Sequence, residues 1–210
     1  MVKTKIFLIR HGKSKGNIEM RFQGWNDTPL SELGVKQAIL LRNYFANKKI
    51  DLVFHSPLKR AYQTALIAFK GKEIPFIKEK GLIERNFGKL DGMSLEELKK
   101  EHPEAESFYY GEINEINGFG VESVVELQER SFETLKTIAE KNEGKTIVLV
   151  GHLFWIKSVL GKILNVPYSE IQKKSVKNAS ITTLKANQNN ETTTFEVKVI
   201  GGKKHLNFLV

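Results

Sequence analysis

Short apolar runs that end beside a histidine or a glycine are the main pattern along this chain. The runs at 6–9 and 147–150 are each followed within two residues by a histidine that neighbours glycine, at His11 and His152. Both runs are too short for a buried helix and rich in branched side chains, which is typical of strands buried on both faces of a parallel sheet. A third run at 51–54 ends at His55 and predicts another strand of this kind.

Helix-start signals occupy the stretches between these strands. Ser31 fits the N-cap of a helix that continues to about residue 47, and Ser94 with Glu97 forms a capping box for a short helix ending before Pro103. The other expected elements are helices at 57–69, 122–142 and 153–165, a short strand at 74–77, and a hairpin built from 180–184 and 195–199. Strand–helix alternation followed by a hairpin predicts the α/β class, as a three-layer α/β/α sandwich with a mixed, mostly parallel central sheet.

The domain organisation follows from the length. A chain of 210 residues can bury one full core, so we expect a single domain over 1–210. The stretch 103–121 carries aromatic residues and glycines, and we expect it to form a lid or excursion over the sheet edge.

The candidate chemistry lies where the predicted strands end. Ligands of open α/β sheets bind outside the carboxyl ends of the strands, so His11 and His152 are expected at the same rim. Arg10 precedes the first of these histidines, and Arg60 follows the strand at 51–54. Two imidazoles and two guanidinium groups at one edge predict a pocket for a phosphorylated anion.

Composition narrows the possible partners. The formal net charge is +9, but the lysines are dispersed in short pairs and aromatic residues are not interleaved with them. This pattern favours a solvated surface that attracts anionic small molecules over a nucleic-acid interface. No apolar stretch approaches the roughly 20 residues that cross a bilayer. There is no cysteine, and the first residues do not read as a signal peptide, so we expect a cytoplasmic protein without disulfides.

Five blocks of sequence resemble, in order, the histidine phosphatase superfamily. They read RHGKSKGN at 10–17, FQGWNDTPLSELGVKQA at 22–38, SPLKRAYQTA at 56–65, LIERNFGKLDG at 82–92 and VGH at 150–152. The superfamily includes phosphoglycerate mutases, the bisphosphatase domain of the fructose-2,6-bisphosphate enzymes and broad-specificity phosphatases. The resemblance implies a phosphoglycerate mutase-like fold and a single domain of this family.

The resemblance also implies catalytic roles for five residues. His11 matches the nucleophile that forms a phosphohistidine, and a neutral imidazole is suited to that attack. Arg10 and Arg60 match the guanidinium groups that bind phosphate, and His152 matches the second imidazole that stabilises developing charge. Glu84 matches the general acid and base of the L-x-E-x-x-x-G-x-x-x-G pattern.

A second set of residues is expected to bind the phosphate. Asn17, Gln23 and Gly24 match family positions that contact phosphate through amide and backbone donors, and Gly12 allows the backbone to approach it. Asn17 and the glycines are also typical of turns, and the two roles are compatible. The acids that compete with Glu84 for the proton-donor role are Asp27, Asp91 and Glu122. His55, His102 and His205 are interpreted as non-catalytic.

Three hypotheses for function follow. The first is a metal-independent phosphatase, a histidine acid-type phosphomonoesterase, that hydrolyses small phosphomonoesters through a phosphohistidine. No metal or other cofactor is expected, because arginines and histidines supply the positive charge. Between Gly92 and His152 the single arginine is Arg130, whereas mutases of the family carry an arginine pair in this region. A cofactor-dependent phosphoglycerate mutase is therefore the alternative and not the first hypothesis. A non-catalytic protein that binds a phosphorylated ligand is the third.

Three departures from the family pattern are expected to alter substrate choice. Lys13 replaces an acidic or amide residue, and Leu153 with Phe154 replaces small or polar residues after the second histidine. Lys157 stands where an arginine is frequent. The partner expected from the sequence is a small phosphorylated metabolite, with neither nucleic acid nor a membrane.

Overall fold

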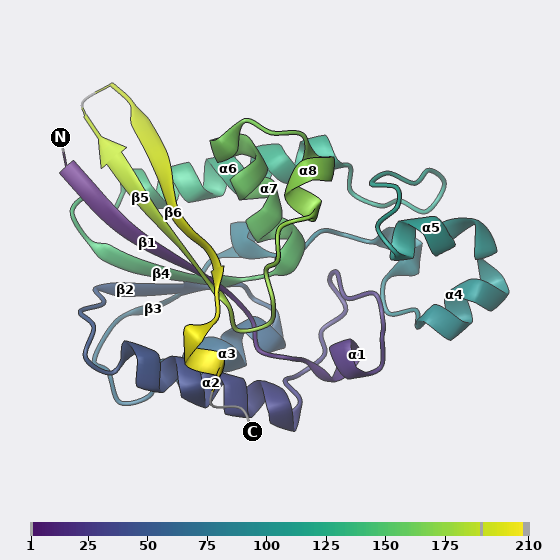
Figure 1. The fold of residues 1–210 in the computed structure, drawn as a ribbon, viewed down its shortest axis with the longest axis horizontal. Helices are drawn as coiled ribbons and strands as arrows, with labels where there is room; N and C mark the ends of the chain where they lie inside the picture. Colours follow the sequence, from purple (N-terminus) through teal and green to yellow (C-terminus); the bar gives the residue numbers. More distant parts are fainter. Residues whose placement is uncertain (1, 190, 208–210) are drawn as a thin grey trace.

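The computed structural model describes residues 2–189 and 191–207 and contains a six-stranded central sheet in this part of the chain (Figure 1). The strands are β1 (Val2–Arg10), β2 (Leu52–His55), β3 (Phe76–Lys78), β4 (Thr146–Gly151), β5 (Ile181–Gln188) and β6 (Thr193–Gly202). Their order across the sheet is β3-β2-β4-β1-β5-β6. The first four pair in parallel, whereas β5 pairs antiparallel with β1 and β6. The predicted mixed, mostly parallel sheet and the terminal hairpin are confirmed.

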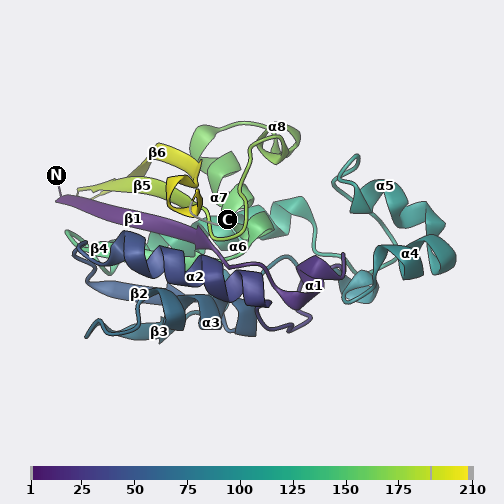
Figure 2. The same cartoon turned by 60° about the horizontal axis from the view of Figure 1, so that its bottom comes forward.

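Helices cover both faces of the sheet and complete the predicted three layers. One face carries α2 (Glu32–Phe45) and α3 (Lys59–Ala68), and the other carries α6 (Val124–Glu140), α7 (Leu153–Leu164) and α8 (Tyr168–Gln172) (Figure 2). The remaining helical segments are α1 (Lys15–Ile18), α4 (Leu95–Glu101), α5 (Glu106–Tyr109) and the 3₁₀ turns Lys80–Leu82, Gly88–Leu90, Pro103–Ala105 and Lys204–Leu206. Within the described residues no helix combines the length and apolarity needed to cross a membrane.

The apolar run in β1 is continuous because both faces of this strand are buried. Ile6 and Leu8 pack into the core under α6 and α7, whereas Phe7 and Ile9 pack into the core under α2 and α3. All four side chains are at most 3% exposed. Because side chains alternate between the two faces of a strand, one run of residues contributes to two separate cores.

Capping residues fix the helix starts. The Ser31 hydroxyl accepts from the amide of Gly34 at the start of α2, and Ser94 forms the predicted capping box with Glu97 at the start of α4. The helix expected from Pro57 begins two residues later, at Lys59, because Leu58 is still extended. The short helices α1 and α8 were not expected from the sequence.

The excursion is larger than predicted. The segment that contains α4 and α5 projects from the sandwich on the side where β1 and β4 end (Figures 1 and 2). It starts before residue 103, because α4 packs within the same small core as the rest of it. That core consists of Phe22, Phe87, Leu90, Leu98, Ala105, Phe108 and Phe119.

Candidate active site

The two histidines predicted to share a rim lie side by side. β1 and β4 are adjacent parallel strands with Arg10 opposite Gly151 in the register, so the residues that follow leave the sheet together. The backbone N–H of His11 donates to the carbonyl of Gly151 at 3.0 Å. The ring centroids of His11 and His152 are 5.2 Å apart, although 140 residues separate them in the chain.

The His11 ring is held as a neutral imidazole with a free Nε2. Its Nδ1 lies 2.7 Å from the carbonyl oxygen of Gly12, so we assign the ring proton to Nδ1. Burial first, and then the positive charges of Arg60 and Arg10, lower the pKa of His11 well below 6.5. Neutral imidazole is the nucleophilic form, and Nε2 carries its lone pair at neutral pH.

His152 is oriented by a serine from the neighbouring strand. Its Nε2 lies 2.8 Å from the hydroxyl of Ser56, which immediately follows β2 and is fully buried. That hydroxyl accepts from the amide of Leu58 at 3.3 Å, so its own proton is available to donate to Nε2. We therefore assign the ring proton of His152 to Nδ1. Sequence reasoning missed Ser56, although its position at a strand end beside the candidate site was the available signal.

The two arginines are anchored by backbone carbonyls, and within the described part of the chain no carboxylate is among their hydrogen-bond partners. Arg10 donates from Nη1 to the carbonyl of Val176 at 2.8 Å, and burial lowers its pKa to about 10, so it remains charged at neutral pH. Arg60 is fully buried, and its two terminal nitrogens donate to three carbonyls of the loop 23–26 at 2.8–3.0 Å. Neutral partners leave both positive charges available to an anion.

Four buried nitrogens at this rim have no hydrogen-bond partner among the described residues. They are Nε of Arg10, Nε of Arg60, Nδ1 of His152 and Nε2 of Gln23. Buried donors are normally satisfied, so a cluster of free ones indicates a site built for a ligand with several acceptor oxygens. A phosphoryl group has this character. Within residues 2–189 and 191–207, no group of three or more His, Asp or Glu side chains is arranged to hold a metal ion.

Glu84 enters the same site from a loop and is held by the first turn of α7. Its carboxyl oxygens accept from the amides of Phe154 and Trp155 at 3.2 and 3.1 Å, and from the amide of Arg85 at 2.9 Å. Burial raises the pKa of Glu84, while these amides and Arg60 oppose the shift. A carboxyl group with a raised pKa next to a phosphate site is suited to exchange a proton with the ester oxygen.

Two further side chains hold the Glu84 loop in place. Arg130 of α6 donates to the carbonyls of Ile83 and Glu84 at 3.1 and 3.0 Å, and it also pairs with Glu122. The indole N–H of Trp25 donates to the carbonyl of Glu84 at 3.0 Å. The sequence placed Arg130 on a long helix but gave no indication that it contacts this loop.

Gly12 is required by the close approach of another backbone segment. A Cβ at this position would lie 2.6 Å from the carbonyl oxygen of Gly34 in α2. The Gly12 amide donates to the hydroxyl of Thr64, which in turn donates to the carbonyl of Arg60. Gly12 and Arg60 are thereby linked through one buried hydroxyl group.

Asn17, Gln23 and Gly24 lie near the rim but already have protein partners. Asn17 completes the capping box of α1 with Ser14, and its side-chain oxygen also accepts from Asn178. The Gln23 side-chain oxygen accepts from two hydroxyl groups, which leaves its Nε2 free. The Gly24 amide donates to Asp91 at 2.8 Å, so it is engaged within the protein, whereas the Gly24 carbonyl holds Arg60.

The acids that competed with Glu84 are engaged elsewhere. Asp91 accepts from the three successive amides of residues 24–26, and Asp27 accepts from the amide of Lys59. Glu122 pairs with Arg130 and accepts from the amide of Asn86. Of the candidate acids, Glu84 is the one buried with the two histidines.

The other three histidines lie away from this cluster. His55 is buried at the end of β2, where it contacts the ring of Tyr62. His102 pairs with Glu104 in the excursion, and the ring of His205 hydrogen-bonds the carbonyl of Ala179.

A cavity of about 270 Å³ lies between the excursion and α7, next to the Glu84 loop. The aromatic walls are Phe22, Phe87, Phe108, Tyr109, Tyr110 and Phe154. Arg85 and Lys157 also line this cavity, which gives it a cationic side.

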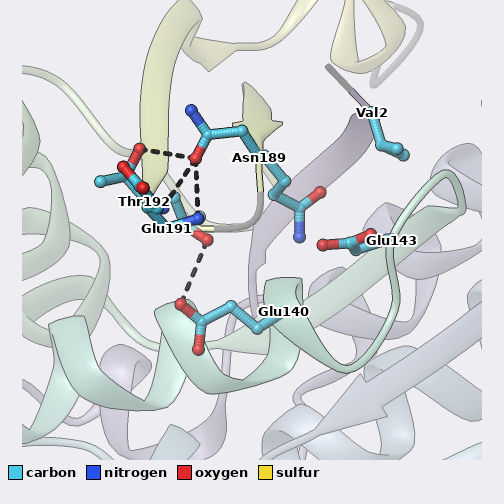
Figure 3. Close-up of a pocket in the computed structure, with 8 residues that line it drawn as sticks. Val2, Glu140, Glu143, Asn189, Glu191 and Thr192 are labelled. Carbon is cyan, nitrogen blue, oxygen red and sulfur yellow. Dashed lines mark hydrogen bonds between the residues drawn. The ribbon is translucent and has the colours of Figure 1, made fainter.

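A larger hollow of about 620 Å³ lies at the opposite end of β1, beside Val2 (Figure 3). Its lining includes Glu140, Glu143 and Glu191 and no lysine or arginine. Three carboxylates without a cation disfavour a phosphate dianion, so this hollow does not compete with the rim that holds the histidines.

A family model described as histidine phosphatase superfamily (branch 1) matches residues 6–196. The chain belongs to the histidine phosphatase superfamily. The match covers all five sequence blocks and both histidines, and the resemblance noted from the sequence is confirmed.

Two relatives of the chain are named phosphoserine phosphatases, and others carry phosphoglycerate mutase names. The chain is 33% identical over 177 residues to phosphoserine phosphatase 1 of Hydrogenobacter thermophilus, covering 84% of each protein. It is 34% identical to the metal-independent phosphoserine phosphatase of Arabidopsis thaliana, over 83% of this chain and 78% of the relative. The solved structure of Bacillus stearothermophilus YhfR superposes with a TM-score of 0.87 at 26% identity, covering 97% of this chain and 100% of the other.

These similarities decide between the functional hypotheses. The chain is a phosphomonoesterase, and the phosphatase interpretation is supported over the mutase alternative. They likewise support an enzyme over a non-catalytic binding protein. The phosphoglycerate mutase-like α/β/α fold is likewise confirmed by the structural match.

Proposed function

We propose that this protein hydrolyses small phosphomonoesters at the rim formed by Arg10, His11, Arg60, Glu84 and His152. The observation that carries the proposal is the set of four buried, unpartnered nitrogens around a neutral imidazole. The donors match the equatorial oxygens of a phosphoryl group, and the free Nε2 of His11 supplies the attacking lone pair.

In the first step, Nε2 of His11 attacks phosphorus and the bond from phosphorus to the ester oxygen breaks. The Glu84 carboxyl gives its proton to that oxygen, so the alcohol leaves in its neutral form. Arg10, Arg60 and Nδ1 of His152 hold the phosphoryl oxygens while negative charge redistributes. A phosphohistidine and a Glu84 carboxylate remain.

In the second step, the Glu84 carboxylate takes a proton from a water molecule that attacks the phosphohistidine. The phosphorus–nitrogen bond breaks, inorganic phosphate forms, and His11 returns to its neutral state with its proton on Nδ1. Glu84 is again protonated, so the cycle closes without a metal or a second substrate. Gln23 completes the binding shell through its free Nε2, and Gly12, Asn17 and Gly24 support this shell through their hydrogen bonds with Thr64, Ser14 and Arg60, respectively.

Phosphoserine is the first substrate to test, since both relatives described above are named phosphoserine phosphatases. The experiment measures phosphate release from O-phosphoserine and 4-nitrophenyl phosphate in EDTA, for the wild type and for His11→Ala. We expect activity that persists in EDTA and is lost in the variant, and an acid-labile phosphoenzyme in the wild type alone. Release that survives in His11→Ala would overturn the assignment of the nucleophile.

The mutase alternative is tested in the same experiment with 3-phosphoglycerate. Conversion to 2-phosphoglycerate without release of phosphate would show that the phosphoryl group returns to the substrate, and it would overturn the proposal that water is the acceptor.

We also propose that the protein works in the cytoplasm, where small phosphorylated metabolites are made and consumed. Fractionation of cells that express a tagged full-length chain tests this location, and recovery of the protein outside the cytoplasmic fraction would contradict it.

A further inference from the structure

Lys157 is a buried cation without an acidic partner. It lies on α7, one turn beyond Phe154, and only 7% of its surface is exposed. Its ammonium group donates to the backbone carbonyl of Gln172 at 2.6 Å and to the side-chain oxygen of the same residue at 2.9 Å. Both partners are neutral, and no ion pair involving Lys157 exists among the described residues. A buried charge without a counter-ion is costly, and proteins normally pair it.

The position of Lys157 links the phosphate site to the aromatic cavity. Long helical side chains point back toward the helix N-terminus, which for α7 is the end that carries His152. Burial, together with the positive charge of Arg10, lowers the pKa of Lys157 to about 8. Lys157 and Gln172 also line the cavity of about 270 Å³.

The end of α8 and the residues that follow it hold both Lys157 and Arg10. Gln172 ends α8 and holds Lys157, and four residues later the carbonyl of Val176 holds Arg10. One short stretch of backbone thereby positions the cation of the phosphate site and the cation of the cavity.

Among the described residues that line the cavity, Lys157 is the cation without an acidic partner. None of these lining residues is an Asp or Glu, so the ammonium of Lys157 is not neutralised from within. Arg85, the other cation of the lining, already pairs with Glu115 at 3.2 Å and donates to the carbonyls of Glu122 and Asn114. The volume equals that of about nine water molecules at ~30 Å³ each, which suits a leaving group of a few carbon atoms.

We propose that Lys157 determines substrate specificity by binding a carboxylate on the leaving group of the phosphomonoester. The inference rests on the proposed function, since it assumes that the phosphoryl group occupies the rim around His11. A single ammonium with one unused N–H matches one carboxylate oxygen, and the aromatic walls exclude water from that contact. Gln172 is the positioning residue, because its two oxygens accept from two of the three N–H groups of the Lys157 ammonium.

Matched pairs of esters test the carboxylate directly. O-phosphoserine and O-phosphoethanolamine differ only by the carboxylate, and 3-phosphoglycerate differs from glycerol 3-phosphate by a carboxylate in place of a hydroxymethyl group. For each pair we expect the wild type to prefer the carboxylate ester in kcat/KM by roughly ten- to a hundredfold, the usual worth of a hydrogen bond to a charged group. In Lys157→Met this preference should fall to near one, mainly through KM for the carboxylate esters.

Two variants separate recognition from structure. Lys157→Arg keeps the charge and should retain most of the preference, whereas Lys162→Met, on an exposed position of the same helix, should leave the ratio as in the wild type. If Lys157→Met unfolds, Gln172→Ala replaces it, since loss of the side-chain oxygen leaves the lysine in place but less well held.

The outcomes distinguish this inference from the proposed function. Suppose that Lys157→Met and Gln172→Ala both hydrolyse 4-nitrophenyl phosphate and both keep the wild-type preference in kcat/KM for the carboxylate esters. This result would overturn the role of Lys157 and leave the proposed function intact. The role of Lys157 would also be overturned if the wild type showed no preference for carboxylate esters. Hydrolysis that persists in His11→Ala would instead remove the proposed function on which the inference rests.

Discussion

The hydrogen bond between Ser56 and His152 makes a sharp prediction for Ser56→Ala. The substitution removes a buried hydroxyl 2.8 Å from Nε2 of a fully buried imidazole, and no second hydrogen bond from residues 2–189 or 191–207 reaches that ring. A neutral hydrogen bond is worth about 0.5–1.5 kcal/mol, and leaving a buried polar atom unpaired costs about 1–3 kcal/mol. Part of this free energy destabilises the fold and part raises the catalytic barrier, because the proton is no longer directed to Nδ1.

We expect kcat for 4-nitrophenyl phosphate to fall about fivefold to thirtyfold, which corresponds to ~1–2 kcal/mol in the barrier. Since His152 is proposed to act on charge that develops during the reaction, kcat and kcat/KM should fall together. The remaining free energy should lower Tm by about 2–4 °C for each 1 kcal/mol, the usual range for a chain of this size. Stopped-flow measurement of nitrophenolate release and a thermal melt give the two quantities separately.

Ser131→Ala is the matched control, because Ser131 is equally buried, lies on α6 and makes no hydrogen bond through its hydroxyl. It should leave kcat unchanged. The reasoning fails if Ser56→Ala keeps the wild-type kcat, or if Ser131→Ala loses as much activity as Ser56→Ala does.

Four further predictions follow from the site. Glu84→Gln should lower kcat for O-phosphoserine by about 10²–10⁴-fold, with a smaller loss for 4-nitrophenyl phosphate, whose leaving group needs no proton; equal losses would contradict the general-acid role. The wild-type rate should decrease as pH rises through the raised pKa of Glu84, and it should persist into mildly acidic solution because the lowered pKa of His11 keeps its ring neutral. A pH–rate profile of the wild type and of Glu84→Gln tests this, because the decrease at alkaline pH should vanish in the variant. Gly12→Ala should cost about 1–3 kcal/mol of stability in a denaturant titration, because its Cβ would meet the Gly34 carbonyl at 2.6 Å; wild-type stability would show that the backbones can separate. Arg130→Met should lower kcat by about tenfold through a looser Glu84 loop, roughly one lost charged hydrogen bond, and an unchanged kcat would assign the arginine to stability alone.

The local pattern of the sequence determined most of the elements. The four apolar residues at 6–9 and at 147–150 are typical of strands covered on both faces, and the capping serines at 31 and 94 fix where two helices start. Each of the two apolar runs ends two residues before a histidine, so the same local signals also located His11 and His152 at strand ends. The short helices α1 and α8 gave no comparable signal, since four or five residues are too few to show periodicity.

The excursion shows where a local pattern is insufficient. Aromatic residues and glycines at 103–121 marked an irregular segment, but α4 joins it only because Leu98 and Phe108 share a small core with Phe22 from a distant loop. Burial of apolar surface decides such a boundary, and it depends on contacts between residues more than eighty positions apart.

What only the tertiary structure decided is how each functional group is held and what state it adopts. The sequence predicted two histidines and two arginines at one sheet edge, and its family resemblance added Glu84 as the general acid and base. It did not determine that Ser56 directs the proton of His152, that the first turn of α7 holds Glu84, or that Lys157 lies in an aromatic cavity and donates to Gln172. These properties arise from burial and from hydrogen bonds between segments far apart in the chain, and propensity and periodicity carry no information about either.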